Sequence, residues 1–185
     1  VVAVGRFCRE KGFECLIRAI ARSRKLFPEI GLVLVGDGEY YNSYKEVVLS
    51  EELIDHVFFA GYQNNPYKYM AKCKCFVLSS ISEGFPNVLA EAMALRLPVI
   101  ATNCFSGPAE ILRNDADYNA VSDKFELCDY GILTPRFVAG EENNASIVEL
   151  SRAIVTLLGS SELMRKYSKL AGQRALLYSE DGARK

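Results

Sequence analysis

The sequence lacks several features on which whole classes of protein depend. It contains no apolar run near the roughly 18–20 residues that cross a bilayer, no signal-peptide pattern at its start and no internal repeat. Its 22 basic and 23 acidic residues give a net charge of −1, so it has no strongly basic face for nucleic acid. These absences predict a cytoplasmic protein without a nucleic-acid partner.

Side chains that bind metals are also scarce. His56 is the only histidine, and the six cysteines show no C-x-x-C spacing. Cys73 and Cys75 form a C-x-C pair, and the chain has only one histidine that could join them. We therefore expect no metal site, and we expect buried free thiols in a reducing compartment. His56 has no partner for base catalysis in the sequence and is interpreted as a surface or capping residue.

Apolar runs of strand length recur along the chain. They are near-continuously hydrophobic rather than alternating, as in parallel strands that helices cover on both faces. They lie at residues 1–4, 32–35, 57–60, 75–78, 98–101 and 131–133. Helical patterns separate or follow these runs, with the clearest stripe at Phe13, Leu16, Ile17 and Ile20. The helical patterns lie at residues 13–27, 39–50, 66–72, 87–96, 146–158 and 162–178.

Strands that alternate with helices form repeated βαβ units, and right-handed crossovers turn these units into a doubly wound sheet. We expect a Rossmann-like α/β fold with a parallel sheet of about six strands in one domain, residues 1–185. The sheet and its helices would occupy residues 1–135, and C-terminal helices residues 145–179. The chain starts directly on the apolar run at 1–4, which we interpret as the start of a fragment of a longer polypeptide.

Ligands of such sheets bind beyond the carboxyl ends of the strands. Glycines follow the first three runs, in Gly5-Arg6, Gly36-Asp37-Gly38 and Gly61-Tyr62, and they permit close backbone approach. Gly36-Asp37-Gly38 lacks the third glycine of a dinucleotide fingerprint, which disfavours a Rossmann oxidoreductase. Most tyrosines are expected to pack in the core, with Tyr62 as the best candidate for stacking on a ligand.

Two carboxylates, Glu83 and Glu91, flank the place where a helix is expected to begin. Asn87 is a good N-cap, so the helix is predicted to start at Val88 with free N–H groups that suit a phosphate. Glu91 lies one position beyond that of a capping box, so capping does not explain it. Carboxylates repel phosphate but accept hydrogen bonds from hydroxyl groups. A diphosphate between two hydroxyl-bearing rings, as in a sugar nucleotide, satisfies this pattern.

A diphosphate also needs positive partners, and the loop after the first run offers Arg6 and Lys11. Arginine presents a fixed fork of donors to phosphate oxygens, and lysine presents a mobile point charge. Either residue alone would be read as a solvated surface cation. At the carboxyl end of a strand, the two are expected to converge above the sheet.

Taken in order, these motifs resemble the C-terminal donor-binding domain of the GT4-type retaining glycosyltransferases, the glycosyl transferases group 1. The resemblance runs from residue 1 to about residue 135 and has its most specific part at 83–94. The other segments that carry it are Val4-Gly5-Arg6, Lys11-Gly12, Val35-Gly36-Asp37-Gly38, 57–62 and Pro98-Val99-Ile100-Ala101-Thr102. The segment 104–112, which lacks paired glycines, resembles enzymes of bacterial surface-polysaccharide assembly.

The resemblance implies a GT-B architecture of two Rossmann-like domains, of which the N-terminal acceptor domain is absent here. It implies that Arg6 and Lys11 hold the diphosphate and stabilise the departing nucleotide, while Glu83 contacts the donor sugar near the reacting carbon. Glu91 would bind the ribose. The remaining contacts to the donor would come from Gly84, Phe85, Asn87, Val88 and Leu89. No cofactor and no obligatory metal are implied, and the donor would be a UDP- or GDP-linked sugar.

The function that follows is transfer of a sugar with retention of configuration, in bacterial surface-polysaccharide or glycoconjugate synthesis. The absent domain would bind a sugar or a lipid-linked acceptor, with a peripheral contact at the inner membrane face in the full-length protein. The fragment alone is expected to be inactive. The alternative is a non-catalytic nucleotide-sugar-binding module, which the intact set of Arg6, Lys11, Glu83 and Glu91 disfavours.

Overall fold

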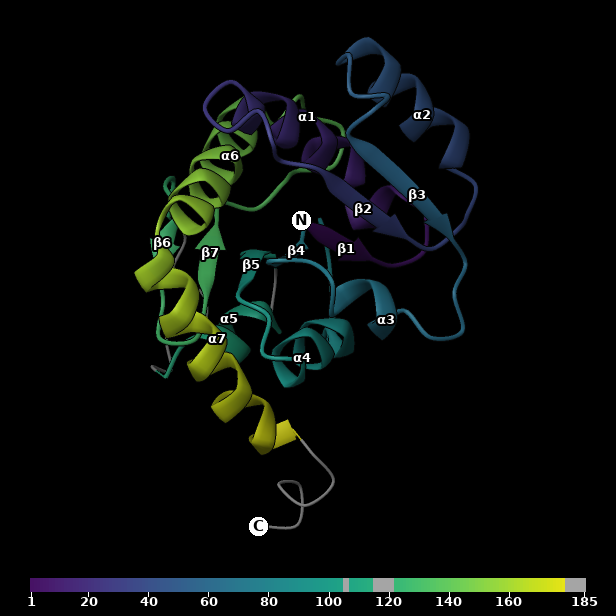
Figure 1. Ribbon diagram of the computed structural model, residues 1–185. Helices are drawn as coiled ribbons and strands as arrows, with labels where there is room; N and C mark the ends of the chain where they lie inside the picture. Colours follow the sequence, from purple (N-terminus) through teal and green to yellow (C-terminus); the bar gives the residue numbers. More distant parts are fainter. Residues whose placement is uncertain (105–106, 115–121, 179–185) are drawn as a thin grey trace.

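The computed structural model describes residues 1–104, 107–114 and 122–178, which form a seven-stranded sheet between two layers of helices (Figure 1). The strand order is β3-β2-β1-β4-β5-β7-β6. The strands are β1 (Val2–Val4), β2 (Leu32–Val35), β3 (Val57–Gly61), β4 (Phe76–Leu78), β5 (Val99–Thr102), β6 (Glu126–Leu127) and β7 (Ile132–Thr134). All neighbours are parallel except β6, which pairs antiparallel with β7. The Rossmann-like parallel sheet is thus confirmed, and β6 is an edge strand that the sequence did not predict.

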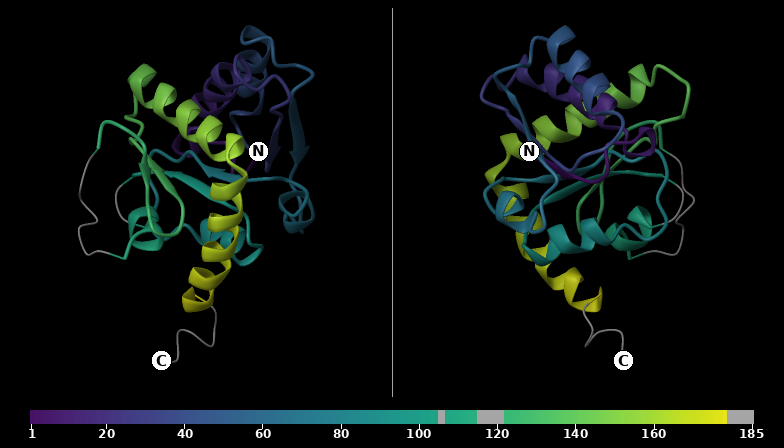
Figure 2. Two further views of the ribbon diagram at one scale, coloured as in Figure 1. Left: turned by 60° about the vertical axis from the view of Figure 1, so that its left-hand side comes forward. Right: turned by 90° about the vertical axis from the view of Figure 1, so that its right-hand side faces the viewer.

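Helices cover both faces of the sheet (Figures 1 and 2). The helices are α1 (Phe13–Arg24), α2 (Tyr41–Ser50), α3 (Tyr67–Met70), α4 (Asn87–Ala94), α5 (Pro108–Leu112), α6 (Asn144–Gly159) and α7 (Ser161–Ala175), with 3₁₀ turns η1 (Arg9–Lys11) and η2 (Leu176–Tyr178). Helices α1, α2 and α6 pack on one face, and α3, α4 and α5 on the other. Helix α7 continues from α6 past the β7 side of the sheet and reaches α4. Among the described residues, no helix combines the length and apolar character that a membrane crossing needs.

Alternate residues of the central strands enter two separate apolar clusters. In β4, Val77 faces α1 and α6, while Phe76 and Leu78 face α4 and α5. In β5, Ile100 faces α1 and α6, while Val99 faces α4 and α5. Successive side chains of a strand point to opposite faces, and here both faces are covered. This is why the strands read as unbroken apolar runs in the sequence.

The start of α4 differs from the sequence prediction by one residue. The helix begins at Asn87, Pro86 is its N-cap, and no side chain caps it. The backbone N–H of Asn87 donates to Phe85 O at 3.0 Å, and that of Leu89 donates to Pro86 O at 2.9 Å. The predicted Asn87 cap with a start at Val88 is therefore wrong, because Pro86 can occupy the cap position without needing an N–H donor. Two sequence predictions extend beyond the described residues. The segment 104–112 includes residues 105–106, and the C-terminal helices were predicted to end at residue 179.

Candidate functional site

The loops after β1 and β4 meet because these two strands are neighbours in the sheet. The N–H of Ile81 donates to Glu10 O at 2.7 Å, and the Ser79 hydroxyl donates to Lys11 O at 2.8 Å. Gly12 has φ +60°, and a Cβ there would lie 2.1 Å from Ser79 O. Only glycine fits this left-handed position at such a close approach. The two loops are therefore locked together at the carboxyl end of the sheet.

Lys11 and Glu83 form an ion pair across these locked loops. Lys11 Nζ donates to Glu83 Oε1 at 2.6 Å, and the Ser80 hydroxyl donates to the same oxygen at 2.6 Å. The side chains are only 23% and 13% exposed, so solvent screens the pair less than it screens a surface ion pair. The sequence assigned the two residues to different parts of one ligand, and the structure brings them into contact. Ser80 was missed, although its place three residues before Glu83 at a strand end was a usable signal.

Arg6 has a different environment from Lys11. Its Nη2 donates to Glu39 Oε2 at 3.1 Å in an exposed ion pair. The two cations, which were expected to converge, thus have separate acidic partners in this structure. Glu39 was not predicted, although it follows the Gly36-Asp37-Gly38 turn after β2.

Arg6 borders a cavity of about 380 Å³ at the carboxyl ends of β1, β2 and β3. Tyr62, the residue predicted to stack on a ligand, has 74% of its surface exposed and lies at the same cavity. Gln63 and Pro66 also line it and were missed, since nothing in their spacing marks them. The remaining lining residues are Val4, Gly5, Val35, Gly36 and Asp37. The lining is largely apolar, which suits a flat ring better than a phosphate.

Helix α4 presents the remaining predicted contacts beside the Lys11–Glu83 pair. The N–H groups of Asn87 and Leu89 donate to carbonyls, whereas that of Val88 has no partner within the described part of the chain. Leu89 is fully buried, so its side chain belongs to the core. Glu91 is half-buried, and its carboxylate has no hydrogen-bond or ion-pair partner in the part of the chain that the structure describes. In the preceding loop, Phe85 leaves 46% of its surface exposed.

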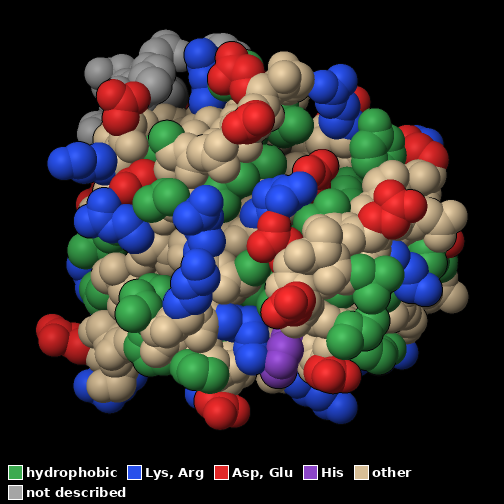
Figure 3. All heavy atoms as spheres, turned by 90° about the horizontal axis from the view of Figure 1, so that it is seen from above, with side chains coloured by type: hydrophobic (Ala, Val, Ile, Leu, Met, Phe, Trp, Pro, Cys, Tyr) green, Lys and Arg blue, Asp and Glu red, His purple; other side chains and the backbone are tan. Residues whose placement is uncertain are grey.

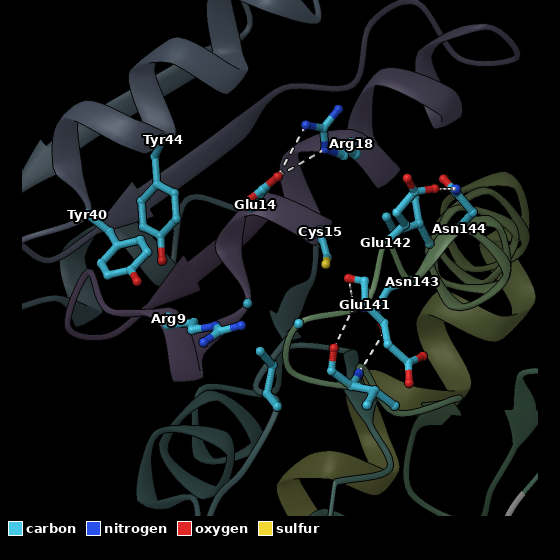
Figure 4. Close-up of a pocket in the computed structure, with 15 residues that line it drawn as sticks. Arg9, Glu14, Cys15, Arg18, Tyr40, Tyr44, Glu141, Glu142, Asn143 and Asn144 are labelled. Atoms are coloured by element: carbon cyan, nitrogen blue, oxygen red, sulfur yellow. Dashed lines mark hydrogen bonds and ion pairs between the residues drawn. The ribbon is translucent and has the colours of Figure 1, made fainter.

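A second cavity, of about 600 Å³, lies on the other side of η1 (Figure 4). Tyr40 and Tyr44 stand on one wall, and the segment that leads into α6 forms another. One of its basic side chains, Arg18, is paired with Glu14 at 3.1 Å and with Glu51 at 2.6 Å. Figure 3 likewise shows basic and acidic side chains interspersed over the face seen from above. No residue proposed from the sequence for a ligand lines this cavity.

Thiols and other possible metal ligands are distributed without clustering. Within residues 1–104, 107–114 and 122–178, no three His, Cys, Asp or Glu side chains are placed to hold a metal ion. Burial, and then the charge of Glu83, raise the pKa of the Cys104 thiol to about 11. Burial likewise raises the pKa of the Cys15 thiol, at the second cavity, to about 11. Both thiols are protonated at neutral pH and are poor nucleophiles.

Residues 1–124 match the family model of the glycosyl transferases group 1. The chain belongs to this family. It is 34% identical over 178 residues to an uncharacterized glycosyltransferase of Methanocaldococcus jannaschii, covering 90% of this chain and 43% of that protein. It is 31% identical over 180 residues to the N-acetylgalactosamine-N,N'-diacetylbacillosaminyl-diphospho-undecaprenol 4-alpha-N-acetylgalactosaminyltransferase of Campylobacter jejuni, covering 97% of this chain and 43% of that enzyme. The chain thus spans less than half the length of these relatives.

Solved glycosyltransferases share the fold. The C-terminal domain of the group 1 family protein LpcC from Francisella tularensis superposes with a TM-score of 0.75 at 22% identity, covering 97% of this chain and 86% of that domain. HepE of Anabaena, solved with UDP-glucose, gives a TM-score of 0.72 at 26% identity, covering 97% of this chain and 43% of HepE. The chain is therefore a glycosyltransferase domain with the architecture of one half of a GT-B enzyme.

Proposed function

We propose that this chain is the donor-binding half of a retaining glycosyltransferase and that it holds a nucleoside-diphosphate sugar above β1 and β4. The observation that carries the proposal is the Lys11–Glu83 pair, a cation and a carboxylate 2.6 Å apart beside the uncapped start of α4. A helix start without a side-chain cap attracts anions, and Lys11 adds a full positive charge. The family membership and the UDP-glucose complex of HepE support this choice of ligand.

The donor would separate the pair. Its diphosphate would accept hydrogen bonds from Lys11, Arg6 and the Val88 N–H, and Glu83, separated from Lys11, would accept hydrogen bonds from hydroxyls of the sugar. The carboxylate of Glu91 would accept from the ribose. The nucleobase would enter the cavity of about 380 Å³ against Tyr62. The ends of one ligand would thus lie on opposite halves of the sheet edge.

The transfer step makes a particular demand on these residues. The bond between the anomeric carbon and the diphosphate breaks, and negative charge develops on the leaving nucleotide. Lys11, Arg6 and the dipole of α4 would stabilise that charge, and Glu83 would orient the sugar. This set of positive groups needs no metal ion to balance the diphosphate. The donor would be UDP- or GDP-linked.

The full-length protein would include an N-terminal domain that binds the acceptor, and this chain alone would transfer nothing. A sugar or lipid-linked acceptor of bacterial surface-polysaccharide or glycoconjugate synthesis fits the relatives. One is named for its action on a diphospho-undecaprenol compound, and another, from Rhizobium meliloti, for lipopolysaccharide core biosynthesis. Such acceptors would place the enzyme in the cytoplasm with a peripheral contact at the inner membrane face.

Calorimetry with UDP, GDP and ADP tests the site in the chain itself. We expect Lys11→Ala to weaken binding of the preferred nucleotide by about 10-fold or more, because a charge-assisted hydrogen bond to phosphate is lost. Arg22→Ala, an exposed substitution on α1 outside the proposed site, is the matched control and should leave the affinity unchanged. Wild-type binding to none of the three nucleotides, or equal affinity in Lys11→Ala, would contradict the site.

The full-length enzyme separates the roles of the two carboxylates. Glu83→Ala should lower turnover about 100- to 1000-fold with a small change in nucleotide affinity, since it removes a contact to the reacting sugar. Glu91→Ala should mainly weaken nucleotide affinity. Donor binding without any transfer in the wild type would instead favour the non-catalytic binding module.

A further inference from the structure

The loop that carries Glu83 rests against the last turn of the described chain. The ring centroids of Phe85 and of Tyr178, in η2, are 5.3 Å apart with the rings inclined by 58°. Beyond Glu83 the loop is open, because a Cβ at Gly84 would find no atom of the described residues within 4 Å. Phe85 is also half-exposed. The ring of Tyr178 can therefore help to fix the position of Phe85.

A second contact reaches the same loop through α5. Gly107, the N-cap of α5, has φ +51°, and a Cβ there would lie 2.2 Å from Gly84 O and 2.6 Å from Pro86 Cδ. The start of α5 thus touches the backbone of the loop. Any displacement of α5 would be transmitted to Gly84 and Pro86, because close-packed groups cannot move independently.

Arg174 of α7 joins these two supports. Its guanidinium donates to Glu110 O at 2.7 Å, Ile111 O at 2.9 Å and Arg113 O at 3.2 Å, which are carbonyls at the end of α5. Such carbonyls lack partners within their own helix, so the arginine acts as a cap from another element. The same guanidinium lies 5.7 Å from the ring centroid of Tyr178. One side chain therefore connects α5 and η2.

Helix α7 also contacts the third part of the proposed site. Ala171 and Ala175 are buried in one cluster with Leu89 and Met93 of α4, the helix that carries Glu91. These alanines allow α7 to approach α4 closely. Helix α7 and the turn η2 that follows it thus contact α4, α5 and the loop before α4.

We propose that Tyr178 and Arg174 are positioning residues, which set the shape of the Gly84–Pro86 loop and through it the place of Glu83. Neither side chain needs to touch the donor for this role. The proposal rests on the proposed function only in that the donor uses this loop. The contact between the rings and the hydrogen bonds to α5 stand without it.

Hydrogen exchange tests the contact directly. The amides of Asn87 and Leu89 donate to the carbonyls of Phe85 and Pro86, so their protection reports on the loop. We expect Tyr178→Ala to speed their exchange by roughly 3- to 10-fold, from the loss of one aromatic pair. The matched control, Leu177→Ala, changes a 57% exposed neighbour in the same turn and should leave exchange unchanged. Tyr178→Phe should restore most of the protection, because it keeps the ring.

Phe85→Ala removes the same contact from the other side. It should reproduce the faster exchange, and the double variant with Tyr178→Ala should exchange no faster than either single variant. Additive effects, or wild-type exchange in Tyr178→Ala, would overturn the contact. This pair of variants keeps the test decisive if one of them folds poorly.

Binding of UDP-glucose, measured by calorimetry, distinguishes the two proposals. We expect Tyr178→Ala to weaken it by roughly the factor found in exchange, with Leu177→Ala as the unchanged reference. Faster exchange with unaltered donor affinity would overturn the positioning role. If wild-type protein binds no nucleotide, the proposed function fails, whereas the exchange result still shows whether Tyr178 holds the loop.

Discussion

The two halves of the ligand-facing edge are built in different ways. On the side of β1, β2 and β3, the turns press directly on one another, since a Cβ at Gly36 would lie 1.9 Å from Gly5 O. Behind them, Phe7 is fully buried in an aromatic cluster. Its ring centroid lies 5.7 Å from those of Phe13 and Tyr44. On the side of β4 and β5, the loop around Gly84 is open and depends on groups from α5 and η2.

The difference lies in how much of the support comes from the core. The first half is held by turns that pack directly on one another and on buried aromatic rings, so its shape is fixed with the fold. The second half is held by the start of α5 and by the ring of Tyr178 in η2, which is distant in the sequence. Loops with few buried contacts belong to the least stable parts of a protein, and they are where ligand-induced changes occur. The carboxylate proposed to meet the sugar lies on this second half.

The largest expected difference between the halves concerns two phenylalanines. Phe7→Ala should lower the free energy of unfolding by about 3–5 kcal/mol, because it leaves a cavity in the aromatic cluster. Phe85→Ala should cost about 1 kcal/mol or less, since half of its surface is already exposed. Urea denaturation measures both. Equal losses would show that the two halves are equally integrated in the core.

Two glycines give the next largest contrast. Gly36→Ala should destabilise the protein by about 2–4 kcal/mol, since it adds a Cβ against Gly5 O at a left-handed φ of +143°. Gly84→Ala should change stability by about 0.5 kcal/mol or less, because its Cβ would have no atom of the described residues within 4 Å. The same denaturation experiment compares them, and a large cost at Gly84 would contradict the open loop.

The two proposed phosphate ligands should differ more modestly. Lys11→Ala should cost about 1–2 kcal/mol of stability, because it leaves the largely buried Glu83 carboxylate without its cation. Arg6→Ala should cost about 0.5 kcal/mol or less, since its pair with Glu39 is exposed. Urea denaturation of both variants measures the two losses of stability. A larger loss for Arg6→Ala than for Lys11→Ala would contradict the prediction.

The smallest expected effect is on the pH dependence of stability. The pKa values of the Cys15 and Cys104 thiols rise from 9.0 to about 11 on burial. A pKa raised in the folded state stabilises the protein fully below pH 9, and the benefit is lost as the pH rises toward 11. We expect Cys104→Ala to reduce this loss of stability by on the order of 1 kcal/mol, measured by urea denaturation at pH 8 and pH 10.5. An unchanged slope would show that Cys104 ionises normally in the folded protein.

Much of the fold was predictable from local pattern, and part of the site was not. All six apolar runs are strands within a residue or two, because burial on both faces imposes an unbroken apolar sequence. The two-residue strand β6 was missed, since so short a segment carries no periodicity. The start of α4 was misplaced by one residue because Asn87 has the composition of a cap but not the conformation. Such boundaries depend on backbone geometry that residue type alone does not specify.

The site shows the same division. Glu83, Lys11 and Arg6 were recognised as residues at strand ends, but their pairing was not. Lys11 meets Glu83 because β1 and β4 are neighbours, and Arg6 meets Glu39 because β1 also neighbours β2. The support from Tyr178 had no sequence signal, since an aromatic near the end of a helix is an ordinary packing residue.

By itself, the sequence determined which segments are strands and helices, which loops lie at the carboxyl ends of the strands, and the family to which the chain belongs. These follow from apolar periodicity and from short motifs, which are local properties. The tertiary structure alone decided which charges meet, which turns exclude a Cβ and which remote turn packs against the Gly84–Pro86 loop. Those outcomes depend on strand order and close packing, through which residues far apart in the chain come within a few ångströms of each other.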